Sequence, residues 1–138
     1  MSNAEARIAK LSIWSGAVSP VALDGGITNR NFIVEDAGRN YVVRLGDDIP
    51  VHQVLRFNEL AASQAAHAAG ISPAVIHHEP GILVLDFIEG RAFEAAAVRD
   101  PDNPARIVPL IQASHRQLPQ PSRSAALELR VFHVLRAY

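Results

Sequence analysis

Short apolar stretches alternate with polar turns through the first fifty residues, as is typical of β-strands. Valine, isoleucine, phenylalanine and tyrosine are frequent in these stretches, whereas glycine, asparagine and aspartate separate them. The pattern predicts strands at residues 21–24, 32–35 and 41–45. An amphipathic segment at residues 4–12 precedes them, and we expect it to form a short helix that is no more than an outer brace of the fold.

The period of the pattern changes to that of a helix after Pro50. Residues 51–69 contain neither glycine nor proline, and Gly70 then supplies a helix stop. Two more strands are predicted at residues 74–78 and 82–88, because a Glu-Pro-Gly turn joins two apolar segments there. The predicted order of elements is therefore β-β-β-α-β-β.

The chain changes character again after its first ninety residues. Residues 91–104 contain two prolines and are typical of a loop. Residues 105–117 and 124–138 predict two helices, with a proline-containing break between them. The second helix reaches Tyr138 without a cap, a glycine or a polar tail, so we expect the natural chain to continue.

These elements predict an α+β fold in two parts. Residues 1–90 would form a five-stranded antiparallel sheet with one inserted helix. Residues 91–138 would form a linker and the first helices of a truncated helical lobe. The chain has 138 residues, of which 49% are hydrophobic, so it has the size of one ordinary domain and enough apolar residues for a packed core.

Composition excludes several functional classes. Thirteen Lys and Arg balance fourteen Asp and Glu, and the net charge of −1 leaves no basic surface for nucleic acid, so we expect no nucleic-acid partner. Because cysteine is absent, disulfides, thiolate catalysis and cysteine-ligated metals are excluded. No segment has the pattern of a signal peptide or about 18 consecutive apolar residues, so we expect a cytoplasmic protein without a membrane partner. The oligomeric state stays open.

The six histidines do not form a metal-binding pattern. His77 and His78 are adjacent on a predicted strand, so their side chains point to opposite faces of the sheet. No two histidines have the i, i+4 spacing that brings two ligands together on a helix. We therefore expect no metal site within this chain.

The turn GGITN, between the first two predicted strands, is a candidate anion site. The successive glycines Gly25 and Gly26 let backbone N–H groups converge, and converging amides form a concavity that binds anions. Thr28, Asn29 and Asn31 add side-chain donors at its rim. The turn is not a P-loop or a Rossmann fingerprint, because a strand follows it rather than a helix. Two interpretations stay open at this point, a phosphate-binding turn and a simple hairpin turn.

Arg44 and Glu59 make the phosphate interpretation stronger. A strand arginine is more often a solvated residue than a ligand, but Glu59 is the only charge on a helix stripe. The other members of that stripe are apolar: Leu55, Ala62, Ala66 and Ala69. An unpaired buried carboxylate is costly, so Glu59 either reaches solvent or pairs with a cation, for which Arg44 is the natural candidate. A strand cation, a helix carboxylate and a glycine turn form the arrangement by which enzymes of the protein-kinase type hold nucleotide phosphates.

Four segments carry a family resemblance. They are GGITNRNF, YVVRLGDD, the Glu59 helix that ends in AAGISP, and GILVLDFIEG. In this order and spacing they resemble the N-terminal lobe of choline and ethanolamine kinases, which belong to the aminoglycoside-phosphotransferase-like branch of the kinase fold. The resemblance covers residues 23–90 and continues more loosely through IVPLIQASHRQL and the final helix. It implies a kinase that uses ATP and Mg²⁺ to phosphorylate the hydroxyl of choline or a similar small amino alcohol.

The resemblance also implies roles for individual residues. It implies that four residues of the glycine turn cover the ATP phosphates: Gly25, Gly26, Thr28 and Asn29. It implies that Arg44 neutralises phosphate charge and that Glu59 fixes Arg44. The end of the fifth strand, at Asp86, Phe87 and Ile88, corresponds to the hinge that binds adenine through its backbone. An apolar strand whose amides meet a purine in an apolar slot fits that role.

The chain departs from the family in one respect. Such enzymes need a His-x-Asp loop, with an Asn five residues after the Asp, and a later metal-binding Asp. No Asp follows any histidine at this spacing, and Asp100 and Asp102 come too early to serve. We therefore expect no catalytic residue here, Mg²⁺ ligands beyond Tyr138, and an inactive fragment. Two alternatives stay open: an aminoglycoside-type phosphotransferase and, if the natural chain ends here, a non-catalytic kinase-like binding module.

Overall fold

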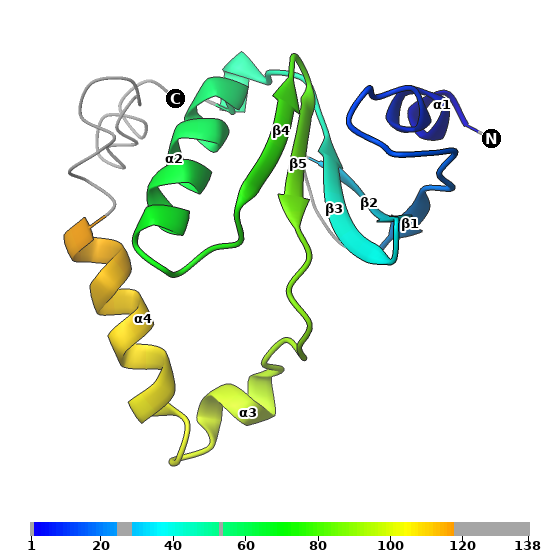
Figure 1. The fold of residues 1–138 in the computed structure, drawn as a ribbon. Coiled ribbons are helices and arrows are strands. Elements are labelled where there is room, and N and C mark those ends of the chain that lie inside the picture. The colour runs from blue at the N-terminus through cyan, green and yellow to red at the C-terminus, as the bar shows by residue number, and fades with distance from the viewer. Residues whose placement is uncertain (1, 25–28, 53, 118–138) are drawn as a thin grey trace.

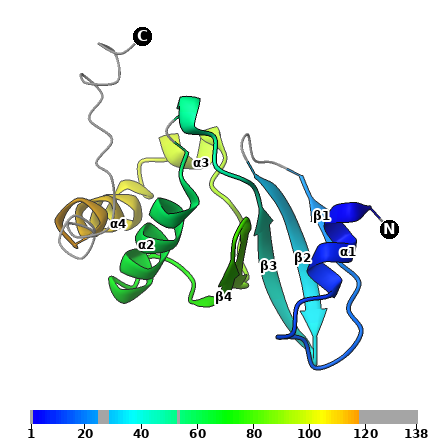
Figure 2. The same cartoon turned by 90° about the horizontal axis from the view of Figure 1, so that it is seen from above.

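The computed structural model describes residues 2–24, 29–52 and 54–117, which form one antiparallel sheet with helices on both sides (Figures 1 and 2). The strands are β1 (Val21–Leu23), β2 (Arg30–Asp36), β3 (Arg39–Leu45), β4 (Val75–Glu79) and β5 (Ile82–Asp86). Their order across the sheet is β1-β2-β3-β5-β4. The five-stranded antiparallel sheet predicted from the sequence is thereby confirmed, except that β5 ends at Asp86 rather than at Ile88.

The edges of the sheet differ from its centre. β1, at one edge, has only three residues, and all three are exposed. β4, at the other edge, pairs with β5 through a register shift between Val75 and His77. The long central strands β2 and β3 pair without interruption from Arg30 and Leu45 to Asp36 and Arg39. The regular part of the ladder is therefore at the centre.

The inserted helix is shorter than the predicted range of residues 51–69. The structure has a 3₁₀ turn at Pro50–His52 and then α2 at Arg56–Ala68. Asp48 determines this start, because its carboxylate Oδ1 accepts the backbone N–H of Arg56 at 2.7 Å. The first N–H groups of a helix have no partner within the helix, so a carboxylate at this place caps it.

Two helices follow β5. α3 (Ala95–Arg99) corrects the prediction of a loop throughout residues 91–104, because three consecutive alanines favour a helical turn there. α4 (Pro104–Gln117) agrees closely with the predicted helix at 105–117 and lies beside α2 (Figures 1 and 2). The helix predicted at residues 124–138 lies outside the described residues.

The segment after β5 exposes many of its large apolar side chains. They are Ile88, Phe93, Val98, Val108, Leu110 and Ile111. No residue of α4 is buried. None of the described helices has the length and apolar character needed to cross a membrane. The sheet, and not this segment, therefore carries the core.

The sheet has two different faces because side chains alternate along each strand. One face is apolar and consists of side chains from β2, β3 and β5: Phe32, Val34, Val43, Leu45, Ile82 and Val84. On the opposite face, Arg44 lies between Asn31 of β2 and Leu83 of β5. Helix α1 (Asn3–Ala9) lies on one side of the sheet and α2 on the other (Figure 2). The main core and Arg44 are thus on opposite faces of the sheet, although Leu83 and Leu85 are also buried on the Arg44 face.

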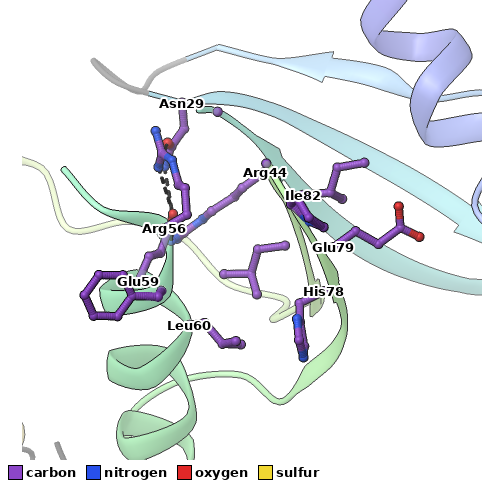
Figure 3. A pocket seen from close by; sticks show the side chains of 13 residues that line it. Asn29, Arg44, Arg56, Glu59, Leu60, His78, Glu79 and Ile82 are labelled. Carbon is purple, nitrogen blue, oxygen red and sulfur yellow. Dashed lines mark hydrogen bonds and ion pairs between the residues drawn. The ribbon is translucent and has the colours of Figure 1, made fainter. Parts of the chain in front are cut away.

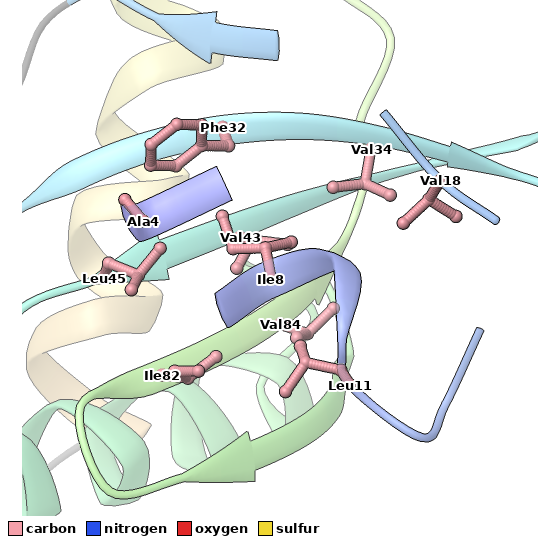
Figure 4. Packing of buried hydrophobic residues seen from close by; sticks show 10 residues of the cluster. All are labelled: Ala4, Ile8, Leu11, Val18, Phe32, Val34, Val43, Leu45, Ile82 and Val84. Carbon is pink, nitrogen blue, oxygen red and sulfur yellow. The ribbon is translucent and has the colours of Figure 1, made fainter. Parts of the chain in front are cut away.

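Helix α1 covers the apolar face and belongs to the core. Ile8 of this helix is 0% exposed and contacts the strand side chains (Figure 4). Three further residues of the N-terminal segment are buried with it: Ala4, Leu11 and Val18. The expectation that this helix is only an outer brace is wrong. An apolar sheet face must be buried against another layer, and the segment before β1 provides that layer.

Hydrogen bonds join the segment after α1 to the end of β2. The backbone N–H of Ser15 donates to both carboxylate oxygens of Asp36 at 3.0 and 3.1 Å, and the Ser15 hydroxyl donates to Oδ1 at 2.7 Å. These bonds lower the pKa of Asp36 because they stabilise the ionised carboxylate, and the bond from the Ser15 backbone has the largest effect. The connection from α1 to the sheet is therefore sensitive to acid.

We expect Ile8→Ala to lower the free energy of unfolding by about 2–4 kcal/mol, because it removes a buried side chain and leaves a cavity. Ile76→Ala is the matched control, since Ile76 is 43% exposed on the edge strand β4. Its expected cost is below about 1 kcal/mol. Urea denaturation of both variants measures the difference, and equal costs would show that α1 is peripheral after all.

We expect Asp36→Asn to remove part of the acid sensitivity of the fold. The pKa of Asp36 is lower in the folded protein than its ordinary value of 3.8, so the bonds from Ser15 stabilise the fold fully above pH 3.8. That contribution is lost as the pH falls through the folded-state pKa. The stability difference between the original protein and the variant should therefore shrink toward zero in acid, as measured by denaturation at several pH values. A difference that stays constant with pH would contradict this assignment, and Asp102→Asn, in the exposed loop between α3 and α4, serves as control.

Candidate functional site

Glu59 of α2 and Arg44 of β3 form the ion pair predicted from the sequence. The distance from Arg44 Nη1 to Glu59 Oε1 is 3.2 Å. Glu59 lies in the first turn of α2, so the helix carries its carboxylate toward the sheet face on which Arg44 lies. The Glu59 side chain is 19% exposed, which makes a cationic partner necessary. The structure therefore brings the predicted cation and carboxylate together.

Arg56 is a second cation at this site, and the sequence analysis missed it. Its Nη1 lies 2.8 Å from Glu59 Oε2 and donates to the side-chain oxygen of Asn29, while its Nε donates to the backbone oxygen of Asp47 at 2.9 Å. Arg56 precedes Glu59 by three residues on a helix, and side chains at that spacing are neighbours. This spacing was a signal that could have identified it.

Asn29 links the site to the connection between β1 and β2. Its side-chain Nδ2 donates to Glu59 Oε1 at 3.3 Å, and its Oδ1 accepts from Arg56. Asn29 is one of the four predicted turn residues, and the other three, Gly25, Gly26 and Thr28, lie outside the described residues. Asn29 and Arg44 therefore bond to the same carboxylate, that of Glu59 on α2.

The charges of Arg44, Arg56 and Glu59 do not cancel one another, although Glu79 also lines the adjacent pocket. Two guanidinium groups share one carboxylate, so these three side chains carry a net charge of +1. Their exposure differs, because the Arg44 side chain is 40% exposed whereas that of Arg56 is 17% exposed. Arg44 can therefore meet an incoming anion while its other side contacts Glu59.

A pocket of about 330 Å³ lies between α2 and the β4–β5 hairpin, next to this cluster (Figure 3). Arg44, Arg56, Glu59 and Asn29 line it together with apolar side chains of α2 and β5. The apolar lining residues include Phe57, Leu60 and Leu83. Its size is at the lower end of pockets that bind small molecules. Polar groups at one wall and apolar groups at the other are typical of a site that orients a ligand.

The predicted hinge residues lie at the other end of β5. Asp86 is opposite Tyr41 in the ladder, three residues from Leu83, which is opposite Arg44. Asp86 Oδ1 forms an ion pair with Arg39 Nη2 at 3.2 Å and also accepts the backbone N–H of Phe87. At roughly 3.3 Å per residue, about 10 Å of strand separates the hinge from Arg44. Only an elongated ligand that runs along the sheet could contact both.

The described residues hold no group of three histidine, aspartate or glutamate side chains that could bind a metal. His77, which was considered as a ligand, instead has Nε2 at 3.0 Å from Glu79 Oε1. His78 is at the wall of the pocket. In this part of the chain the chemistry of the site therefore rests on arginine, carboxylate and amide groups.

The model of the phosphotransferase enzyme family matches residues 20–137. The chain belongs to this family. The match includes all five strands, the Arg44–Glu59 pair and the predicted hinge of this phosphotransferase. Comparisons with curated proteins and with solved structures returned no match. The family match supports transfer of a phosphoryl group and does not distinguish a choline-type from an aminoglycoside-type substrate.

We expect double-mutant cycles to give a larger coupling for Arg56–Glu59 than for Arg44–Glu59. The Arg56 pair is shorter and less exposed, so its coupling should be about 1–2 kcal/mol, against roughly 0.5 kcal/mol for the more solvated Arg44 pair. Denaturation of the single and double alanine variants measures both terms. A larger coupling for the Arg44–Glu59 pair would contradict the expectation that the shorter and less exposed pair is the stronger one.

Proposed function

We propose that this chain is the nucleotide-binding part of an ATP-dependent kinase that phosphorylates the hydroxyl of choline or a related small amino alcohol. One observation carries the proposal: the 40% exposed Arg44 guanidinium is held by Glu59 beside a pocket that a second cation, Arg56, also lines. Phosphoryl transfer depends on positioning and on fixed cations that stabilise phosphate oxygens. Membership of the phosphotransferase family supports this type of chemistry.

In this proposal Arg44 neutralises charge on the ATP phosphates. Glu59 keeps the guanidinium at the sheet face, because an unpaired arginine side chain would sample many rotamers. The resemblance assigns contact with the phosphates to Gly25, Gly26 and Thr28, and the next residue, Asn29, donates to Glu59. Each of these groups binds or orients, and none of them moves a proton.

Adenine would lie at the Asp86 end of β5. There the backbone of Asp86, Phe87 and Ile88 would meet a purine, in the manner of the family hinge. The N–H of Asp86 donates to the Ala74 oxygen and that of Phe87 to the Asp86 carboxylate, so the purine would bind to the remaining backbone groups. Ile88 is 64% exposed and supplies an apolar surface for a ring. The span of about 10 Å between this end and Arg44 suits an elongated nucleotide that lies along the sheet.

Mg²⁺ would neutralise and bridge phosphate oxygens when bound. The described residues contain no acidic cluster that fits such an ion, so no step is assigned to it here. The sequence also contains no His-x-Asp segment, so no residue of this chain is proposed as the base that accepts the hydroxyl proton. The chain's own part in catalysis is to bind and orient the nucleotide.

The choline-type substrate is the finer part of the proposal. It rests on the resemblance of the glycine turn and of YVVRL to choline and ethanolamine kinases. An aminoglycoside-type phosphotransferase is compatible with the same family match. The two are separated by which hydroxyl compound stimulates ATP consumption.

We expect Arg44→Ala, in the full protein that contains this chain, to lower kcat/KM for ATP by about 10²–10³-fold in choline-stimulated turnover, because a fixed cation is lost from the phosphates. Arg30→Ala is the matched control. Arg30 lies on the adjacent strand β2, at the opposite face of the sheet, and its guanidinium lies over the Phe32 ring at 5.5 Å. A denaturation profile should show that both variants fold.

Unchanged activity of a folded Arg44→Ala protein would refute the phosphate role. Stimulation by an aminoglycoside and not by choline or ethanolamine would move the protein to the other branch and leave the role of Arg44 intact. A full protein that binds no nucleotide and consumes no ATP with any of these compounds would favour the binding-module alternative.

A further inference from the structure

We infer that Arg56 is a positioning residue that locks the nucleotide-binding turn and the loop after β3 onto α2, and so keeps Arg44 aimed at the phosphates. This inference rests on the proposed function, because it takes the Arg44 side of the sheet as the nucleotide side. It adds a second arginine, with a role different from that of the first.

The contacts of Arg56 come from three separate segments of the chain. Its side chain bonds to Asn29 at the end of the β1–β2 connection, to the backbone oxygen of Asp47 after β3, and to Glu59 on its own helix. A planar guanidinium carries five N–H donors in a fixed fork, so one side chain can hold three partners at set angles. A lysine, with a single nitrogen, cannot reproduce this geometry.

Gly46 leaves room for the Arg56 guanidinium, because the atoms nearest to a Cβ at this position are the ends of two side chains and not backbone. A Cβ atom at position 46 would lie 2.5 Å from Arg56 Nη2, 2.8 Å from Arg56 Cζ and 2.9 Å from Asn29 Oδ1. Gly46 does not have the positive φ that would otherwise explain a glycine. The glycine is therefore explained by the space that the Arg56 guanidinium and the Asn29 amide occupy.

Exposure separates the tasks of the two arginines. The Arg56 side chain is 17% exposed and is bonded to Asn29, Asp47 and Glu59, whereas the Arg44 side chain is 40% exposed at the pocket (Figure 3). Arg56 contacts Glu59 Oε2 and Arg44 contacts Oε1, so the two guanidiniums do not compete for one oxygen. Arg56 thus neutralises much of the Glu59 charge, so the positive charge of Arg44 is only partly compensated and can attract an anion.

The experiment compares four variants of the full protein in steady-state kinetics with ATP as the varied substrate: Arg56→Lys, Arg56→Ala, Gly46→Ala, and the double variant Gly46→Ala with Arg56→Ala. We expect each single variant to raise KM for ATP and to lower kcat/KM by about 10- to 100-fold, because a small misplacement of a binding group has effects of that size. Arg56→Lys should not rescue activity although it keeps the charge.

The double variant is the sharper readout. Once Arg56 is shortened to alanine, the methyl group at position 46 has no guanidinium to displace and meets only the Asn29 amide, so the combined effect should be smaller than the sum of the two. The double variant should have a kcat/KM closer to that of Arg56→Ala alone than to the value for additive effects. Gly16→Ala is the control for a harmless glycine substitution, since a Cβ there meets nothing within 4 Å.

Several outcomes would overturn the inference. They are an unchanged KM for ATP in folded Arg56→Lys and Gly46→Ala proteins, full rescue by lysine, and additive effects in the double variant. If Arg56→Ala fails to fold, Arg56→Lys and Gly46→Ala alone decide the question, because the former keeps the charge and the latter keeps the arginine. Loss of activity in Arg44→Ala with normal Arg56 variants would refute this inference and leave the proposed function standing. Normal activity in all Arg44 and Arg56 variants would refute both.

Discussion

The carboxylate of Glu59 is the interaction on which the arrangement of this lobe depends. A charged group that is largely removed from water is tolerated only when cations and donors surround it, and both oxygens of Glu59 have such partners. Those partners come from the β1–β2 connection, from β3 and from α2 itself. One costly charge therefore fixes the relative position of a turn, a strand and a helix.

The period of two along the strands separates stability from chemistry. Side chains of one parity face α1 and form the dry core, with Phe32, Val34, Val43 and Val84 nearly free of solvent contact. Side chains of the other parity face α2, and Arg44 is among them. A side chain substituted on one face of the sheet therefore makes little direct contact with the side chains on the other face. The same short sheet can be rigid on its packed side and chemically specialised on the side of the pocket.

Much of this structure could be predicted from local pattern, because strand alternation and the helix stripe act on neighbouring residues. The five strands and the Arg44–Glu59 pair are of this kind. The role of α1 could not be predicted, since an amphipathic segment does not reveal how much sheet surface it must cover. Convergence of Gly46, Asn29 and Arg56 depends on the register of distant segments. The start of α2 at Arg56 could not be predicted for the same reason, because the capping carboxylate of Asp48 lies outside the helix.

The irregular edges of the sheet have a consequence for how molecules of this protein meet one another. An open sheet presents unpaired N–H and C=O groups at both borders, and a long flat border is a template for a strand of another molecule. β1 offers only three residues at one border, and the register shift of β4 interrupts the other. Both borders are thus poor partners for a further strand. Contacts between copies would therefore depend on exposed apolar side chains, of which the segment after β5 has several, and not on continued strand pairing.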